Sequence, residues 1–260
     1  MKRREFIKGG LLLGAAGLGG ALSLGALRPA AALPPTGAAS GARRWGLVID
    51  LDKYNQSADR EKIAALCHRR HNVPDIPDTK TEIKWIWEDD FAHSFAEMES
   101  PYLSDRIKEM RFPVLCNHCA EPACVKVCPT QATFQRPDGI VNMDYHRCIG
   151  CRFCMAGCPF GARSFNFFDP RPYIAEIDPL YPTRTGGVVE KCTFCVERLT
   201  AGLPPYCVEA AAGAIIFGDL SDPASEARRA LASGFAIRRK AELGTEPSVY
   251  YLLGGGGGDA

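Results

Sequence analysis

The sequence has no strong excess of charge and no motif for chemistry on a bound substrate. Its 31 lysines and arginines nearly balance its 30 aspartates and glutamates, so the formal net charge is +1. A near-neutral chain gives no electrostatic reason to expect nucleic acid or an anionic surface as a partner. It also lacks a nucleophile–base pair and a phosphate-binding glycine loop. These absences argue against an enzyme that breaks bonds in a substrate of its own.

Cysteine, by contrast, is abundant, with 12 in 260 residues. Residues 148–159 have the C-x2-C-x2-C-x3-C-P spacing of bacterial iron-sulfur proteins, and residues 116–129 have the looser C-x2-C-x4-C-x3-C-P. In such runs three thiolates bind one [4Fe-4S] cluster and the fourth binds its neighbour. The spacing therefore predicts cluster A, with ligands Cys116, Cys119, Cys124 and Cys158, and cluster B, with ligands Cys148, Cys151, Cys154 and Cys128.

Two other uses of cysteine are the alternatives, and either would give an exported structural protein held together by zinc or by disulfides. Structural zinc takes four ligands, arranged as two pairs. Each motif here instead has three closely spaced cysteines followed by a fourth in a Cys-Pro pair, which is more than a zinc site needs. Disulfide frameworks suit small secreted chains that cannot build a core. This chain is 46% hydrophobic over 260 residues, which is enough to bury a core without such bridges. Iron-sulfur ligation accounts better for two regularly spaced sets of four cysteines.

The other four cysteines lie at the two ends of the cysteine-bearing region. Cys67 falls on an expected helix from Asp59 to Arg70, where a lone cysteine is usually a small buried apolar side chain. Cys192, Cys195 and Cys207 form C-x2-C-x11-C and lack a fourth ligand, because Ala211 stands at the expected position. One cysteine plus three is the ligand set of one further cluster, so the chain has thiols for three clusters.

In these cysteine motifs the sequence resembles the four-cluster ferredoxin-like electron-transfer subunits that accompany molybdopterin oxidoreductases and quinone-reactive membrane proteins. The resemblance implies that cluster C is held by Cys192, Cys195, Cys207 and Cys67. It also implies that a fourth cluster was lost, together with the early cysteines expected near Tyr54 and with the thiol replaced by Ala211.

Four segments carry a narrower resemblance, to the DsrO-type exported iron-sulfur subunits of the Dsr membrane complexes of sulfur-metabolising prokaryotes. It covers roughly residues 44–253, and the segments are 116–119, 144–154, 163–172 and 249–251. The resemblance implies three [4Fe-4S] clusters that relay single electrons between an NrfD-like, quinone-interacting membrane subunit and a multihaem cytochrome c subunit. The alternative within the superfamily is the iron-sulfur subunit of a molybdopterin oxidoreductase or hydrogenase.

The same resemblance implies an α+β fold of two nested ferredoxin-like lobes with short helices and hairpins. The expected inner two-cluster lobe is 111–169, the outer lobe is 44–110 plus 170–218, and 219–260 is a C-terminal extension with a glycine-rich tail. Short strands are expected at 45–50, 132–134, 139–141 and 163–167, and a helix from Asp222 to Ala232. Trp85 and Trp87 mark either a core strand or a partner surface, and Arg238-Arg239 either a solvated face or an attachment to a partner.

The N-terminal segment is typical of an export signal. Arg3-Arg4 is followed by an apolar run from Gly9 to Leu27 and by an A-x-A site at 30–32, which resembles a Tat signal peptide over residues 1–32 ahead of a flexible leader at 33–43. An uncleaved membrane anchor is the alternative. Clusters are assembled on reduced thiolates, so a cluster protein bound for the periplasm has to fold before export. We therefore expect a location in the periplasm or at the outer face of the cytoplasmic membrane.

Overall fold

The structure is a computed structural model that describes residues 43–254. The expected signal segment, nearly all of the leader and the end of the glycine-rich tail lie outside the described residues. The strands are β1 (Trp45–Asp50), β2 (Ile86–Asp89), β3 (Phe112–Leu115), β4 (Thr133–Gln135), β5 (Val141–Met143), β6 (Ser164–Phe165), β7 (Val189–Glu190), β8 (Ile215–Asp219), β9 (Phe235–Ile237) and β10 (Val249–Leu253).

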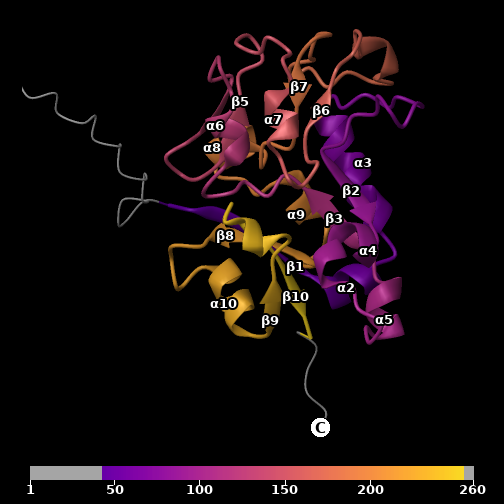
Figure 1. Ribbon diagram of the computed structural model, residues 1–260, viewed down its shortest axis with the longest axis vertical. Helices are drawn as coiled ribbons and strands as arrows, with labels where there is room; N and C mark the ends of the chain where they lie inside the picture. The colour runs from indigo at the N-terminus through magenta and orange to yellow at the C-terminus, as the bar shows by residue number, and fades with distance from the viewer. Residues whose placement is uncertain (1–42, 255–260) are drawn as a thin grey trace, which may run out of the picture. The chain divides into compact units, whose positions relative to one another are not determined.

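The helices are short, which fits the expected α+β class with its small sheets (Figure 1). The α-helices are α2 (Leu51–Gln56), α3 (Arg60–Arg70), α4 (Phe91–Ser94), α5 (Asp105–Glu109), α6 (Ala123–Lys126), α7 (Phe153–Ala156), α8 (Val196–Thr200), α9 (Tyr206–Ala210) and α10 (Glu226–Ala232). Three 3-10 turns are η1 (Ala96–Met98), η2 (Arg171–Tyr173) and η3 (Ala241–Leu243).

A four-stranded sheet with the order β8-β1-β10-β9 joins the beginning and the end of the described chain. Strand β1 is the apolar run expected at residues 45–50, and it pairs antiparallel with β8 and parallel with β10. The sequence prediction contained no strand at 249–253, so the place of β10 beside β1 is a finding of the structure. The C-terminal extension therefore contributes two of the four strands, β9 and β10.

Three further sheets have two strands each, β2-β3, β4-β5 and β6-β7. The β4-β5 hairpin lies inside the expected inner lobe. The other two pair residues from opposite sides of the expected lobe boundaries, since Ile86 faces Leu115 and Ser164 faces Glu190. One hydrophobic core also contains side chains from both expected lobes, among them Leu47, Phe112 and Cys192. The division into nested lobes stays a prediction.

The structure places Trp85, the C-terminal helix and Arg239, for which specific expectations followed from the sequence. Trp85 is 1% exposed and leads into β2, so it belongs to the core. The C-terminal helix ends at Ala232 as expected, but it begins later than expected, because the Ser225 side chain and not Asp222 accepts the N-cap hydrogen bond, from the Arg228 N–H. The solvated face expected for Arg238-Arg239 is wrong for Arg239, which is buried and donates from Nε to the Ser94 carbonyl oxygen at 2.9 Å.

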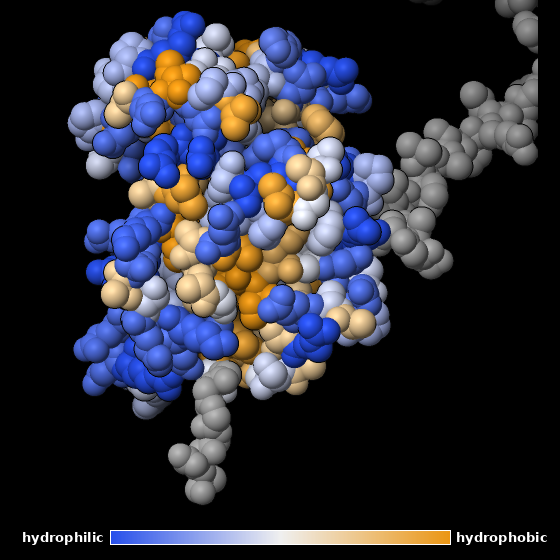
Figure 2. Space-filling view, turned by 180° about the vertical axis from the view of Figure 1, so that it is seen from behind, coloured by the Kyte–Doolittle hydropathy of each residue, from blue (hydrophilic) through white to orange (hydrophobic). Residues whose placement is uncertain are grey.

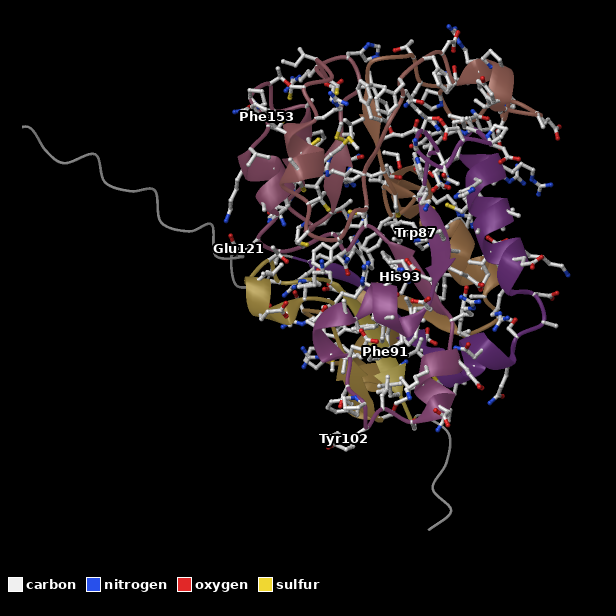
Figure 3. The ribbon with its side chains drawn as sticks, turned by 45° about the vertical axis from the view of Figure 1, so that its right-hand side comes forward. Trp87, Phe91, His93, Tyr102, Glu121 and Phe153 are labelled. Atoms are coloured by element: carbon white, nitrogen blue, oxygen red, sulfur yellow. The ribbon has the colours of Figure 1, made fainter. Side chains whose placement is uncertain are left out.

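Several large apolar side chains remain exposed, including Ile149, Phe153 and Leu180. Phe153 projects outward from α7 (Figure 3), and Figure 2 shows hydrophobic side chains gathered in a band on the face seen from behind. Exposed apolar patches of this kind often mark contacts with other proteins. Within residues 43–254 no helix combines the length and the apolar composition that crossing a membrane requires.

Candidate iron-sulfur centres

The four cysteines predicted to bind cluster A line one cavity. Cys116 follows β3, Cys124 lies on α6, and Cys119 and Cys158 belong to the loops after β3 and α7. Together with Val141, Phe160 and Arg163 they border one small cavity. The structure therefore gathers thiols from two separate motifs, as the crossed-ligand prediction requires.

Packing between α6 and α7 places the fourth predicted ligand of cluster A, Cys158, beside the other three. Gly157 ends α7 so close to α6 that a Cβ on it would lie 3.0 Å from the Val127 side chain. The residue after this close approach is Cys158, which thereby reaches the motif of Cys124. The same contact holds the end of α6, where Cys128 follows, against the helix that carries Cys154.

The electrostatics of this cavity fit a metal cluster. Burial raises the pKa of the Cys119 thiol to about 12, and the nearby sulfurs of Cys116, Cys124 and Cys158 add to the effect. Burial also raises the pKa of the Cys158 thiol, again with Cys116 contributing. Four converging sulfurs repel one another as thiolates, so bound iron would supply the positive charge that stabilises their ionised form. The donor set fits a [4Fe-4S] cluster.

The thiols predicted for cluster B are brought together in part. Cys154 is buried in a small core cluster with Val141 and Met143, and Cys148 packs against it. Cys151 is exposed. Partial burial would raise the pKa of the Cys128 thiol, but N–H groups of the following turn outweigh it and hold this pKa below its ordinary value. The ligation of cluster B by Cys128 and Cys151 stays a prediction.

The B motif depends on a glycine between two of its cysteines. Gly150 has φ +69°, and a Cβ there would lie 2.5 Å from the Gly187 carbonyl oxygen. A side chain at this position would push the loop away from the segment that leads to β7. Cys148-Ile-Gly-Cys151 therefore needs its glycine for backbone reasons, independently of any metal.

The third predicted quartet converges from three distant parts of the chain. All four of its thiols are buried, and helices α3 and α9, which carry Cys67 and Cys207, pack against each other. Burial raises the pKa of the Cys67 thiol well above its ordinary value, with further contributions from Cys192, Cys195 and Cys207. Burial likewise raises the pKa of Cys207 to about 11. This convergence fits the quartet predicted for cluster C.

The region predicted to have lost a fourth cluster is packed with protein atoms. Helix α2 occupies residues 51–56, and its Tyr54 is 1% exposed. The Tyr54 hydroxyl donates a hydrogen bond to Glu88 Oε1 at 2.7 Å. Ala211 ends α9 and is 2% exposed. Both belong to the main hydrophobic core, so this part of the protein is held by ordinary side-chain packing.

Sequence reasoning missed His71, which lies beside the third quartet. Its Nδ1 is 2.7 Å from the Cys67 carbonyl oxygen and 3.6 Å from Cys67 Sγ, and its Nε2 is 3.1 Å from Glu197 Oε1. The ring stacks on Trp85 with centroids 4.7 Å apart. Its spacing of four residues from Cys67 was the available signal, because such residues share a helix face.

A second missed feature is the buried carboxylate of Glu190. It accepts hydrogen bonds from Trp85 Nε1 at 2.8 Å and from Asn166 Nδ2 at 2.6 Å. Arg184 Nη2 lies 2.6 Å from Glu190 Oε2, and both side chains are fully buried. This network joins β2, β6 and β7 around the motif that begins at Cys192.

His118 and His146 lie one and two residues, respectively, before a predicted cysteine ligand, where they could donate a hydrogen bond to cluster sulfur. His118 is buried, and its Nδ1 accepts the Val141 N–H at 3.1 Å, while its ring stacks on Phe194. His146 is exposed. The structure gives neither histidine a hydrogen bond to a cysteine sulfur within residues 43–254.

The fold and the gathered thiols define a ferredoxin-like iron-sulfur protein. A family model described as 4Fe-4S dicluster domain matches residues 107–168. This match covers all eight cysteines of the two inner motifs.

Relatives extend the similarity to nearly the whole chain. The Hdr-like menaquinol oxidoreductase iron-sulfur subunit 1 of Archaeoglobus fulgidus is 38% identical over 98% of this chain and 99% of its own length. The menaquinone reductase iron-sulfur cluster-binding subunit of Nitratidesulfovibrio vulgaris is 37% identical over 80% of this chain and 88% of its own length. A tetrathionate reductase subunit of Salmonella typhimurium is 46% identical, but over 57% of this chain and 54% of its own length.

The chain belongs to this family of ferredoxin-like iron-sulfur electron-transfer subunits, and within it to the DsrO type. These relatives are iron-sulfur subunits of redox complexes and not the catalytic subunits. The prediction of an electron-transfer subunit without substrate chemistry of its own is confirmed.

Proposed function

We propose that the protein carries three [4Fe-4S] clusters and relays single electrons through a quinone-linked membrane complex. The observation that carries the proposal is the convergence of Cys67 with Cys192, Cys195 and Cys207 beside the dicluster domain. A bound cluster accepts and donates one electron at a time. The protein's part is to hold the thiols and to fix the environment of each cluster.

The placement of the thiols supports one order for the clusters. The thiols predicted for clusters A, B and C are called sets A, B and C. Cys154 of set B and Cys124 of set A belong to one small core cluster, while Cys116 of set A and Cys192 of set C belong to the main core. Set A thus lies between the other two, and the relay would run B, A, C or in reverse. Cys151, a predicted ligand of cluster B, is exposed, so cluster B would be the cluster nearest to solvent.

Family membership supports the assignment of partners. Two relatives that match over most of their length are the iron-sulfur subunits of a menaquinol oxidoreductase and of a menaquinone reductase, and another is that of an arsenate respiratory reductase. We propose an NrfD-like, quinone-interacting membrane protein at one end and a multihaem cytochrome c at the other. Sulfur metabolism is supported by the DsrO resemblance and by similarity to a tetrathionate reductase subunit and a polysulfide reductase chain.

Export through the Tat pathway to the periplasm is part of the proposal. The twin arginines Arg3-Arg4, the apolar run and the A-x-A site support it. The test replaces Arg3-Arg4 by Lys-Lys and measures where the protein accumulates. Export predicts loss of the periplasmic pool, whereas an unchanged periplasmic pool would argue against this route.

A second candidate is the iron-sulfur subunit of a sulfur-compound reductase with its own catalytic subunit. The 46% identity to the tetrathionate reductase subunit favours it, although that match covers about half of each chain. Purification of the native complex separates the two candidates. Co-purification with a haem protein and a quinone-reactive membrane protein supports the first, and co-purification with a molybdenum protein supports the second.

Replacing Cys67 with Ala tests the cluster assignment directly. Loss of the fourth thiol should remove one cluster, so iron falls from about twelve to about eight atoms per chain while the inner two clusters remain. The matched control is Ile63→Val on the same helix, which shortens a buried side chain and should keep the full iron content. Unchanged iron in the Cys67 variant would contradict the assignment.

A further inference from the structure

Two buried cations, Arg163 and Lys191, lie between the thiol quartets. Arg163 is 4% exposed and Lys191 is 0% exposed. Within residues 43–254 neither forms a salt bridge with a carboxylate, whereas the buried cation Arg184 is paired with Glu190. An uncompensated buried charge is costly, so its presence points to a counter-charge that a bound group supplies.

Arg163 contacts the boundary between sets A and B. Its Nη2 donates to Cys124 Sγ at 3.0 Å and to Thr133 Oγ1 at 2.8 Å, and its Nη1 lies 3.3 Å from Met143 Sδ. Cys154 of set B also interacts with this guanidinium. One positive charge therefore faces a ligand of each quartet.

Lys191 occupies the corresponding place between sets A and C. Its Nζ donates to the carbonyl oxygens of Val141 and of Cys192, the latter at 2.7 Å. Val141 lines the cavity of set A, and Cys192 is a predicted ligand of cluster C. The ammonium is thus held by backbone oxygens beside both quartets.

We infer that Arg163 and Lys191 are fixed counter-ions of the clusters, each raising the reduction potentials of the two clusters that it separates. The inference rests on the proposed three-cluster relay. Reduction adds a negative charge to a cluster, and a nearby buried cation stabilises that charge because the surrounding dielectric constant is low. Cluster A would lie beside both cations, so both should raise its reduction potential.

The test measures the midpoint potential of each cluster by EPR-monitored redox titration of the holo-protein. Cys67→Ala identifies the signal of cluster C by its loss. Arg163→Gln should lower the potentials of A and B and leave C unchanged, while Lys191→Gln should lower those of A and C and leave B unchanged. The cluster that shifts in both variants is then A.

Two further variants keep the test decisive. Arg163→Lys retains the charge and should keep potentials near those of the unmodified protein. Arg147→Gln removes an exposed cation next to the ligand Cys148 and should shift nothing, because solvent screens it. If Arg163→Gln loses clusters, retention in Arg163→Lys supports a charge effect, and equal loss in both contradicts it.

The inference is overturned if fully loaded neutral variants have unchanged potentials, or if all three potentials shift alike. Iron content of the unmodified protein distinguishes this outcome from failure of the proposed function. Fewer than three clusters in that protein would refute the relay itself, whatever the variants show.

Discussion

The Tyr54 hydroxyl and the Glu88 carboxylate are joined by a 2.7 Å hydrogen bond where the family resemblance predicts the remnant of a fourth cluster site. Burial, followed by the hydrogen bond to Glu88, raises the pKa of Tyr54 far above its ordinary value. This part of the protein therefore contains a neutral phenol and apolar packing in place of ligand chemistry.

Tyr54→Phe should lower the free energy of unfolding by about 1 kcal/mol, because it removes one hydrogen bond from a buried ring. Urea denaturation followed by circular dichroism measures the change. Iron content and the visible spectrum should stay the same. Loss of iron in this variant would mean that the region still supports a cluster.

Glu190→Gln should destabilise the fold much more, by about 3–5 kcal/mol, because it leaves the buried Arg184 guanidinium without its counter-charge. The same denaturation experiment applies. Glu209→Gln is the control, since Glu209 pairs with Arg198 at the surface and its loss should cost less than about 1 kcal/mol. Similar effects of the two variants would refute the importance of the buried pair.

The exposed pair of Asp90 and His93 predicts a pH dependence. A hydrogen bond from His93 Nδ1 to Asp90, at 2.6 Å, raises the pKa of His93 above its ordinary 6.5. The pair therefore contributes its stabilisation below about pH 6.5, and this is lost as pH rises through the folded-state pKa. NMR titration should give a raised pKa for His93 that returns toward 6.5 in Asp90→Asn. An unshifted His93 in the unmodified protein would contradict the pairing.

Cysteine spacing predicted which thiols belong together because ligand geometry fixes the intervals between them. The crossed-ligand rule alone assigns Cys116 and Cys158 to one quartet, and the fold brings them to one cavity. Strand β1 was equally predictable, since a buried strand is a continuous apolar run. That these thiols bind clusters stays a prediction until iron is measured.

Other features depend on contacts between residues that are distant in sequence. Arg163 and Lys191 look like surface cations until the chain segments around them are placed. The pairing of β10 with β1 could not be predicted, because the two strands lie about 200 residues apart and no local pattern links them. For the same reason Arg239, in an apparently solvated basic pair, proved to be buried.

Measurement of iron and acid-labile sulfide per chain in the purified protein tests directly whether the twelve thiols hold three clusters. Three [4Fe-4S] clusters require about twelve of each. About eight of each would make Cys67 and its three partners ordinary buried thiols, and a preparation without iron or sulfide would mean that the protein is not an iron-sulfur protein.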